Sequence, residues 1–538
     1  MPTRHLASAC RRVVALTLLL LAGVLPGLAQ TTPPQTSEPP AVRLVLLVAV
    51  DQFRFDYLTR FRGEYSAGLD LLLTRGAVFT DAHLEHGQTV TAVGHATMLT
   101  GALPTVSGII SNGWYDRASG KAVTSVSDPA LQLVGGTGEA SSPHRLLVST
   151  IGDEVKMASG RGAGERPRAI GVSMKDRSAI LPLGRSADAA YWFDNTSGNF
   201  VTSTFYLTEA PAWVSRFNAR RMTDGYAGTR WTFTGAPEGA PAGRDLPTEL
   251  GLRLNEAVYT SPYGNDVLLA FARDALVEER LGQRGVTDLL SVSFSSNDAV
   301  GHRYGPDSPE VHDISVKTDA VIGALLADVD RLVGLDHTLV IFTTDHGVAP
   351  LPEAAQAWKL PGGRFASAAM NEAIQHALDT RFGKASWVLA SGSSVYLDHA
   401  LVAARNLDPA EVRRVAAAAA ATVPHVARVY TREDLIGGAV PGDRVSQRVA
   451  RSYHAVRSGD LEVVLEPFWI RGATGTTHGS PYEYDAHIPL ILMGPGVTPG
   501  RYHRHAALND VAPTLAVLLR VATPSGSSGR VLAEALAP

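Results

Sequence analysis

“VRLVLLVAVD”, residues 42–51, is an almost continuous apolar run that ends in an aspartate. Such runs are typical of parallel strands covered on both faces, because a strand with one exposed face alternates apolar and polar residues. The same shape recurs in “VTDLLSVSFSSND” at 286–298 and in “HTLVIFTTDHG” at 337–347. Each run ends in Asp or Asp-His, and open parallel sheets bind ligands at the carboxyl ends of their strands. We therefore predict that these polar side chains meet at one edge of a sheet.

The segment between the last two runs has helical periodicity. Its sequence, “VHDISVKTDAVIGALLADVDRLVG” at 311–334, places apolar residues three and four positions apart, which predicts a strand–helix–strand crossover. One more buried strand is expected in “HIPLILMG” at 487–494. Further helices are expected at 264–282, 367–383, 409–422 and 509–520. The pattern predicts an α/β fold with a mostly parallel central sheet and helices on both faces.

Two segments interrupt this pattern. Residues from about 185 to 250 and from about 356 to 470 contain Pro/Gly-rich or alternating stretches, and we interpret both as inserted cap segments. The length of 538 residues allows one large α/β domain with insertions, or two to three domains. We assign residues 43–538 to one catalytic domain that carries both cap insertions.

The N-terminus has the three parts of an export signal. A charged part with Arg4, Arg11 and Arg12 precedes the apolar run 13–25, and a small-residue cleavage site follows at 27–29. The apolar run is too short to span a membrane and is followed at once by a proline. A cleaved signal is therefore favoured over a membrane anchor.

We assign residues 1–29 to this signal peptide and the proline-rich stretch 30–42 to a tether without a packed structure. The mature protein is then expected to be periplasmic or secreted, with no membrane span. The adjacent arginine pair leaves general secretion and twin-arginine export both open.

Composition narrows the function class. The formal net charge is −4, and removing residues 1–29 would leave 45 basic against 52 acidic side chains. A mildly acidic protein is not expected to bind nucleic acid or an anionic membrane as its main partner. The one cysteine, Cys10, lies inside the signal, so the mature chain has no disulfide, thiol nucleophile or thiolate metal site. Any metal must be held by histidines and carboxylates.

Candidate metal ligands follow the predicted strands. Asp298 and His302 are four residues apart, so both can point to one side of a helical turn. An Asp at a strand end is more often a cap or turn residue, but the whole set matches the carboxylate and imidazole ligands of catalytic zinc. Together they predict a metal hydrolase. The set is Asp51, Asp298, His302, Asp345, His346 and His478.

A threonine lies at the start of a small-residue helix pattern. In “HGQTVTAVGHATMLTG”, residues 86–101, Thr91 directly precedes the run AVGHATML. It is either the cap of that helix or a nucleophile, and the residues alone leave both interpretations open.

Eight blocks follow one another between residues 44 and 520. They are “VDQFRFDYL”, “TVTAVGHATMLTG”, “SNGWYD”, “SMKDRSAILPLG”, “SSNDAVGHRYGP”, “TTDHGVAP”, “THGSPYEYDAHIPLILMGPGV” and “DVAPTLAVLL”. In this order they resemble the alkaline phosphatase superfamily, and in detail its phosphate-irrepressible, threonine-nucleophile branch (PafA type). The resemblance covers nearly the whole mature chain.

The resemblance implies two zinc sites and a nucleophile. One zinc would be held by Asp51, Asp345 and His346, with the Thr91 oxygen completing it, and the other by Asp298, His302 and His478. Thr91 takes the nucleophile position. The residues in contact with the outer phosphoryl oxygens would be Asn112, Lys175 and Arg177.

This site implies an alkaline phosphatase that hydrolyses small phosphate monoesters through a covalent phosphothreonine. A monoester carries a dianionic phosphoryl group, which Lys175 and Arg177 favour over a singly charged diester. The main alternative is a nucleotide pyrophosphatase/phosphodiesterase of the same superfamily, which shares the metal site but lacks this basic pair.

Three other interpretations fit less well. Arylsulfatases need an oxidisable Cys or Ser motif that the mature chain lacks, and a cofactor-independent phosphoglycerate mutase would be cytosolic. A zinc-binding protein without catalysis would be expected to have lost Thr91, Asn112 or the basic pair. An additional Ca²⁺ stays open, as do the physiological substrate, the oligomeric state and the optimum pH.

Overall fold

The central element of the fold is a mostly parallel sheet around the strand predicted at 42–51. The computed structural model describes residues 41–159, 164–234, 239 and 242–537. Over this part of the chain the main sheet has ten strands, in the spatial order β21 (Gly500–Tyr502), β2 (Ala77–Phe79), β20 (Leu490–Met493), β13 (Thr338–Thr343), β1 (Leu44–Val50), β12 (Asp288–Phe294), β7 (Ala169–Ser173), β8 (Ala189–Asp194), β9 (Asn199–Ser203) and β6 (Leu133–Val134).

The register of the central strands brings their carboxyl ends to one edge. β1 pairs in parallel with β12 and β13, so that Ala49 lies opposite Thr343 and Val50 opposite Phe294. β12 pairs in parallel with β7 on its other side. The three apolar runs that predict parallel strands are therefore confirmed, and they are immediate neighbours in the sheet.

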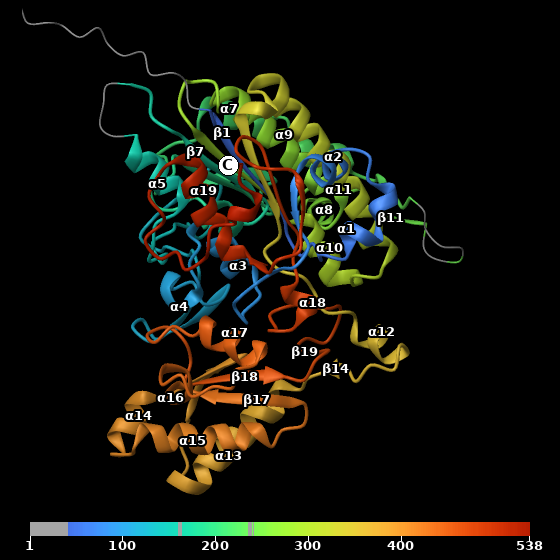
Figure 1. Cartoon of the computed structure of the whole chain (residues 1–538). Helices are drawn as coiled ribbons and strands as arrows, with labels where there is room; N and C mark the ends of the chain where they lie inside the picture. The colour runs from blue at the N-terminus through green and yellow to red at the C-terminus, as the bar shows by residue number, and fades with distance from the viewer. Residues whose placement is uncertain (1–40, 160–163, 235–238, 240–241, 538) are drawn as a thin grey trace, which may run out of the picture. The chain divides into compact units, whose positions relative to one another are not determined.

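Both faces of the sheet are buried, which explains the lack of alternation in its strands. Successive side chains of β1 enter two hydrophobic clusters, Leu46 and Val48 on one face and Leu47 and Ala49 on the other. Helices on both faces are thus confirmed (Figure 1). The first face is covered by α9 (Pro262–Glu278) and α11 (Pro309–Leu332), and the second by α3 (Thr91–Thr100) and α19 (Val511–Leu519).

The strand expected in 487–494 enters this sheet in the opposite direction. β20 is antiparallel to both of its neighbours, β13 and β2. It is fully buried, which is why its sequence reads like that of a parallel strand. Apolar burial on both faces therefore predicts the strand but not its direction.

The segment from about 185 to 250 differs from the cap expected there. β8 pairs in parallel with β7 and β9 pairs with β8, so these strands extend the central sheet. The next helix, α7 (Ala212–Ala219), contributes Trp213 and Phe217 to the hydrophobic cluster that contains α9. Residues 189–203 therefore belong to the central sheet and not to a cap, and the short length of these two buried strands hides them in the sequence.

The segment from about 356 to 470 contains a separate four-stranded sheet. Its strands run antiparallel in the order β15 (Val388–Ser391), β16 (Ser394–Leu397), β18 (Leu461–Leu465) and β17 (Val426–Thr431). Two long helices share its hydrophobic cluster (Figure 1), and they match two of the predicted helices. They are α13 (Ser367–Phe382) and α15 (Pro409–Ala421).

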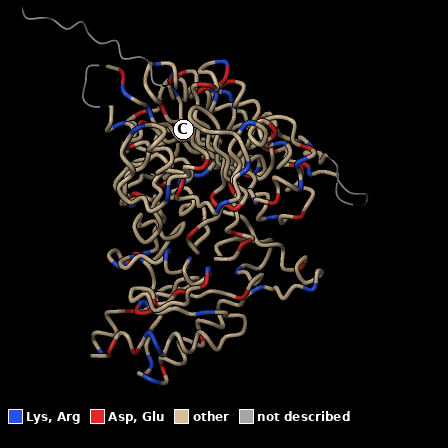
Figure 2. Tube along the Cα trace, viewed as in Figure 1, with Lys and Arg blue, Asp and Glu red and all other residues tan. Residues whose placement is uncertain are grey.

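The predicted signal peptide at 1–29 lies outside the described residues, as does the tether at 30–42 except for its last two positions. Within the described part of the chain, no helix combines the length and the apolar character needed to cross a bilayer. Basic and acidic residues are intermixed along the described trace (Figure 2).

Candidate active site

The polar residues that follow β1, β12, β7 and β13 lie together at the carboxyl edge of the sheet. Asp51 directly follows β1, and Asp345 lies two residues after β13. Asp298 belongs to α10 (Ser296–Tyr304), which starts just after β12. Lys175 follows β7, and its Nζ lies 3.1 Å from Asp51 Oδ2 and 2.7 Å from Asp298 Oδ2. The edge predicted from the apolar runs therefore exists.

One group of potential ligands surrounds Thr91. His346 Nε2 lies 3.1 Å from Asp345 Oδ2 and 3.5 Å from Thr91 Oγ1. Asp51 belongs to the same group, because it offers an oxygen within 4.8 Å of one from Asp345. Its Oδ2 contacts Lys175 Nζ. Asp345 Oδ2 is buried and has no hydrogen-bond partner among the described residues. An orphaned carboxylate oxygen of this kind is costly unless a cation compensates it.

A second group consists of Asp298, His302 and His478. Asp298 Oδ1 lies 3.3 Å from His302 Nε2 and 3.6 Å from His478 Nε2. The two Nε2 atoms are 3.2 Å apart. One ligand atom from each residue therefore lies within 4.8 Å of the other two, which is a spacing that a single metal ion can bridge.

The orientation of the imidazoles supports metal binding. The Nδ1 atoms of His346, His302 and His478 lie 2.9, 2.7 and 2.7 Å from the backbone oxygens of Gly347, Thr476 and Thr89. A carbonyl only accepts hydrogen bonds, so each Nδ1 carries a proton, and in its neutral form each ring presents an Nε2 lone pair to the site. Lone pairs that converge on a carboxylate repel one another, and a divalent cation relieves this repulsion.

The charges of the site hold Asp298 and His478 in ligand form. Burial raises the pKa of Asp298, but the charges of His302 and Lys175 outweigh it and hold this pKa well below the ordinary value. Burial and the charges of His346 and His302 lower the pKa of His478 well below its ordinary range. Asp298 is therefore an anion and His478 a neutral imidazole, the forms that bind metals.

For His302 and His346, burial lowers the pKa but the charges of Asp298 and Asp345 outweigh it and raise the pKa, so a metal ion would replace a proton on these two rings.

Thr91 is not the cap of its helix. It is the first helical residue of α3, and the preceding Val90 occupies the N-cap position with an extended backbone and no side-chain cap bond. The hydroxyl of Thr91 is buried and faces His346. Helix α3 approaches closely because position 94 is a glycine, where a Cβ would collide with the backbone oxygen of Asp345. The nucleophile interpretation is the one that this geometry favours.

The three residues expected to contact the phosphoryl group differ in how many of their donors are already hydrogen-bonded. Asn112 Oδ1 accepts a 2.8 Å hydrogen bond from the backbone N–H of Ala92, which leaves its Nδ2 to donate elsewhere. Arg177 Nε is buried without a hydrogen-bond partner among the described residues, so it is a donor available to an anion. Lys175 instead contacts Asp51 and Asp298 and thereby links the two groups.

Lys175 is charged at neutral pH. Burial lowers the pKa of its ammonium group, but the charges of Asp298 and Asp51 outweigh burial and raise this pKa above its ordinary value. The lysine therefore adds a fixed positive charge between the two ligand groups.

Two further residues belong to the site and are not among those predicted. Gln52 adopts a φ of 61°, and it donates from its backbone N–H to Asp345 Oδ1 at 3.0 Å and from Nε2 to Asp298 Oδ1 at 2.7 Å. His95 Nε2 lies 2.9 Å from Ser293 Oγ and 3.5 Å from Asp51. Their signals were present in the sequence, as the residue after Asp51 and as the imidazole one helical turn after Thr91.

A cavity of about 270 Å³ opens beside the site. Its lining includes Val90 and His478, together with Glu462, Trp469 and Arg471 from the end of the second predicted cap segment and the residue after it. Burial raises the pKa of Glu462 to about 8. The cavity is therefore placed to receive the part of a substrate that extends beyond the reacting group.

Comparisons with known proteins show the family of this chain. A family model described as type I phosphodiesterase / nucleotide pyrophosphatase matches residues 45–481. A Myroides odoratus protein named calcium-transporting ATPase is 34% identical, over 92% of this chain and 94% of its own length. Alkaline phosphatase PafA of Elizabethkingia meningoseptica is 32% identical, over 93% of this chain and 96% of its own.

A solved structure gives the same relationship. The crystal structure of wild-type alkaline phosphatase PafA matches with a TM-score of 0.85 at 32% identity, covering 93% of this chain and 99% of that one. The chain therefore belongs to the type I phosphodiesterase/nucleotide pyrophosphatase family and is a homologue of alkaline phosphatase PafA, with the same fold, as its motifs predict.

Proposed function

We propose that this protein is an alkaline phosphatase that hydrolyses phosphate monoesters through a phosphothreonine at Thr91. The observation that carries the proposal is the position of the Thr91 hydroxyl, which lies 3.5 Å from His346 Nε2 beside two clusters of metal-ligand type. Homology to a protein named alkaline phosphatase supports the monoester class.

The reaction proceeds in two displacements at phosphorus. Thr91 Oγ1 forms a bond to phosphorus while the bond to the ester oxygen breaks, and the alcohol leaves. Water then attacks the phosphothreonine, which releases phosphate and restores the hydroxyl. The ten-residue helix α3 starts at Thr91, so the positive end of its dipole favours the anion at this position. Arg177 Nε and Asn112 Nδ2 are the donors suited to the outer phosphoryl oxygens.

Two Zn²⁺ ions are the cofactors that we infer for the ligand groups. Asp51, Asp345 and His346 would hold the first together with Thr91, and Asp298, His302 and His478 would hold the second. The residues fit divalent cations because one carboxylate oxygen is orphaned and three Nε2 lone pairs face the site. When bound, the ions would lower the pKa of the threonine hydroxyl and of water and stabilise charge on the attacking and leaving oxygens. An additional Ca²⁺ stays a prediction.

A phosphodiesterase or pyrophosphatase is the second candidate function, and the description of the matching family favours it. The relative named as an ATPase adds ATP to the substrates that should be compared. The positive charges of Lys175 and Arg177, whose side chains are 8% and 27% exposed, support the monoester, because its phosphoryl group carries one more negative charge than that of a diester.

Export to the periplasm or the medium belongs to the same proposal, on the strength of the signal sequence at 1–29. Small phosphate monoesters would then be extracellular or periplasmic substrates. That the protein binds no nucleic acid stays a prediction.

Steady-state hydrolysis of matched nitrophenyl phosphate, phosphodiester and sulfate esters, and of ATP, tests the function when combined with metal analysis of the purified protein. We expect kcat/KM to be highest for the monoester, about two bound Zn²⁺ at the active site, and loss of turnover in Thr91→Ala. Preference for the diester or for ATP would overturn the monoester assignment.

A further inference from the structure

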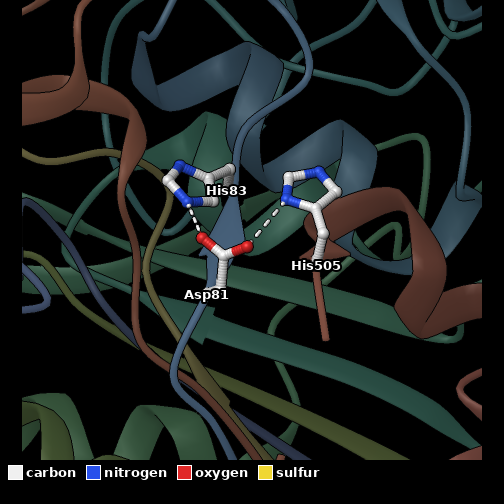
Figure 3. Close-up of side chains that lie close together, drawn as sticks. All are labelled: Asp81, His83 and His505. Carbon is white, nitrogen blue, oxygen red and sulfur yellow. Dashed lines mark hydrogen bonds and ion pairs between the residues drawn. The ribbon is translucent and has the colours of Figure 1, made fainter. Parts of the chain in front are cut away.

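A second type of ligand cluster lies apart from the active site. Asp81 Oδ1 is 2.7 Å from His83 Nε2, and Asp81 Oδ2 is 3.3 Å from His505 Nδ1 (Figure 3). One ligand atom from each residue lies within 4.8 Å of the other two. None of the three belongs to the groups around Thr91 or Asp298.

The backbone holds these ligands in a fixed register. His83 ends β3 (Ala82–His83), and His505 directly precedes β22 (Ala506–Ala507). The two strands pair in parallel. His487 stacks on the His83 ring with 4.6 Å between ring centroids, which fixes the plane of that imidazole.

Each histidine has a carboxylate at both ring nitrogens. His83 Nδ1 lies 2.9 Å from Glu483 Oε2, and His505 Nε2 lies 3.0 Å from Glu85 Oε1. A neutral imidazole has only one N–H. If that N–H is donated to the glutamate, the other nitrogen directs a lone pair at Asp81. This carboxylate–histidine arrangement is the one that orients imidazoles on metals.

One contact favours a different protonation state. Arg448 Nη2 lies 3.4 Å from His83 Nδ1, so it is a potential donor to the same nitrogen. The glutamate is closer, and Arg448 Nη1 itself contacts Glu483 Oε1 at 3.0 Å. Arg448 and His83 therefore share Glu483, and with an ion between His83 Nε2 and Asp81 the tautomer that donates Nδ1–H to Glu483 satisfies both ring nitrogens.

We propose that Asp81, His83 and His505 bind a divalent transition-metal ion of the Zn²⁺ class. Two imidazoles and one carboxylate suit such ions, whereas Ca²⁺ and Mg²⁺ prefer oxygen ligands throughout. The His83 side chain is only 5% exposed, but those of Asp81 and His505 are 41% and 44% exposed. The ion can thus enter from solvent, and water completes its coordination.

The residues around this cluster lie a few positions along the chain from active-site residues. Glu85 precedes Thr91 by six residues, and Glu483 follows His478 by five. Arg448 Nε donates to the backbone oxygen of Leu84 at 2.9 Å, which ties the same segments together from the other side. The bound ion is therefore a structural clamp on the two loops that carry the nucleophile and a metal ligand. This role does not depend on the reaction proposed for Thr91.

Metal stoichiometry tests the proposal. The full chain is stripped with a chelator and titrated with Zn²⁺, and bound metal is counted by mass spectrometry and calorimetry. The double variant Asp81→Asn/His505→Gln should bind one Zn²⁺ fewer than the wild type. His503→Gln is the matched control, because His503 contacts only the Thr80 hydroxyl nearby and is not a member of the cluster. Equal stoichiometry in all three proteins would overturn the proposal.

Two further measurements exclude an indirect effect. Glu85→Gln should weaken Zn²⁺ binding at this site by about 10- to 100-fold without removing a ligand, as expected for a carboxylate that orients a metal-bound histidine. Melting curves in excess chelator should coincide for the wild type and the double variant, whereas added Zn²⁺ should raise the Tm of the wild type further. A variant that already melts lower in chelator, with unchanged metal count, would show a purely structural ion-pair cluster and refute the site.

The design also separates this proposal from the proposed phosphatase activity. The double variant should retain nitrophenyl phosphate hydrolysis, since none of its substituted residues contacts the groups around Thr91. A wild type without any phosphatase activity but with the extra Zn²⁺ would refute the function and leave the clamp intact.

Discussion

Thr91 Oγ1 lies 3.5 Å from His346 Nε2 although 255 positions separate the two residues in the chain. Because the Nδ1 proton of His346 is donated to the oxygen of Gly347, the nitrogen that faces the threonine is an acceptor when the ring is neutral. A hydroxyl that is buried beside an acceptor and at a helix start is placed for nucleophilic attack. The substitutions at Thr91 therefore give the most direct test.

Thr91→Ala should reduce monoester turnover by roughly 10³-fold or more, because loss of a nucleophile removes the covalent route. Thr91→Ser keeps a hydroxyl and should retain measurable activity. Quenching the wild type in acid during turnover should yield a phosphorylated peptide that contains Thr91, detected by mass spectrometry. Comparable activity of the alanine variant and the wild type would contradict the assignment.

Lys175→Ala combined with Arg177→Ala should lower kcat/KM for a monoester by about 10²- to 10³-fold, with a much smaller loss for a matched diester. The reason is the extra negative charge of the monoester. Lys121→Ala, at an exposed lysine on β5 (Lys121–Thr124), provides the control. Equal losses on both substrates would show that the pair does not discriminate between the charges of the two phosphoryl groups.

Gly94→Ala should destabilise the protein by about 1–3 kcal/mol, although alanine favours helices by about 1 kcal/mol over glycine. The new Cβ meets the backbone oxygen of Asp345, which cannot rotate away like a side chain, so the collision outweighs helix propensity. Denaturant unfolding measures the effect. Gly63→Ala, where an added Cβ meets no atom within 4 Å, is the control; a neutral Gly94→Ala would show that α3 can move.

Glu462→Gln should change the pH dependence of stability. Burial raises the pKa of Glu462 to about 8 in the folded protein, against the opposing effects of Ser394, the Gly459 backbone and Arg471. The folded state therefore retains a proton that the unfolded chain releases, and the wild type loses stability as the pH rises from about 4.3 to about 8.

The glutamine variant has no such proton, so its Tm relative to the wild type should rise across this interval and then level off. The difference corresponds to at most a few kcal/mol at pH 9. Glu466→Gln, at a half-exposed glutamate on the same segment, serves as the reference. A constant Tm difference between pH 5 and pH 9 would contradict the raised pKa.

Much of the sheet could be predicted because its strands carry one strong signal, apolar burial on both faces. That signal does not give the direction of a strand, so β20 could be predicted only as a strand. The short strands β8 and β9 could not be recognised inside a segment that was interpreted as a cap. The ligands at strand ends, such as Asp51 and Asp345, follow from the topology alone.

The remaining site residues have only a weak local signal, namely their places next to Asp51 and one helical turn after Thr91. His95 lies within a helix of small residues and resembles a buried core histidine, and Gln52 acts through a backbone conformation that a sequence does not display. The cluster of Asp81, His83 and His505 depends on the pairing of β3 with β22, whose residues are more than 400 positions apart in the chain. Such sites become visible only when distant segments are placed side by side.

The place of β20 between β2 and β13 also bears on how the protein is made. A ribosome delivers the chain from its N-terminus, so the first strand and Asp51 emerge long before His478 and β20. Until this last part of the polypeptide has been synthesised, the sheet lacks the strand between β2 and β13, and the proposed metal site lacks His478. We therefore expect products that terminate before β20 to lack the hydrolytic power of the finished molecule.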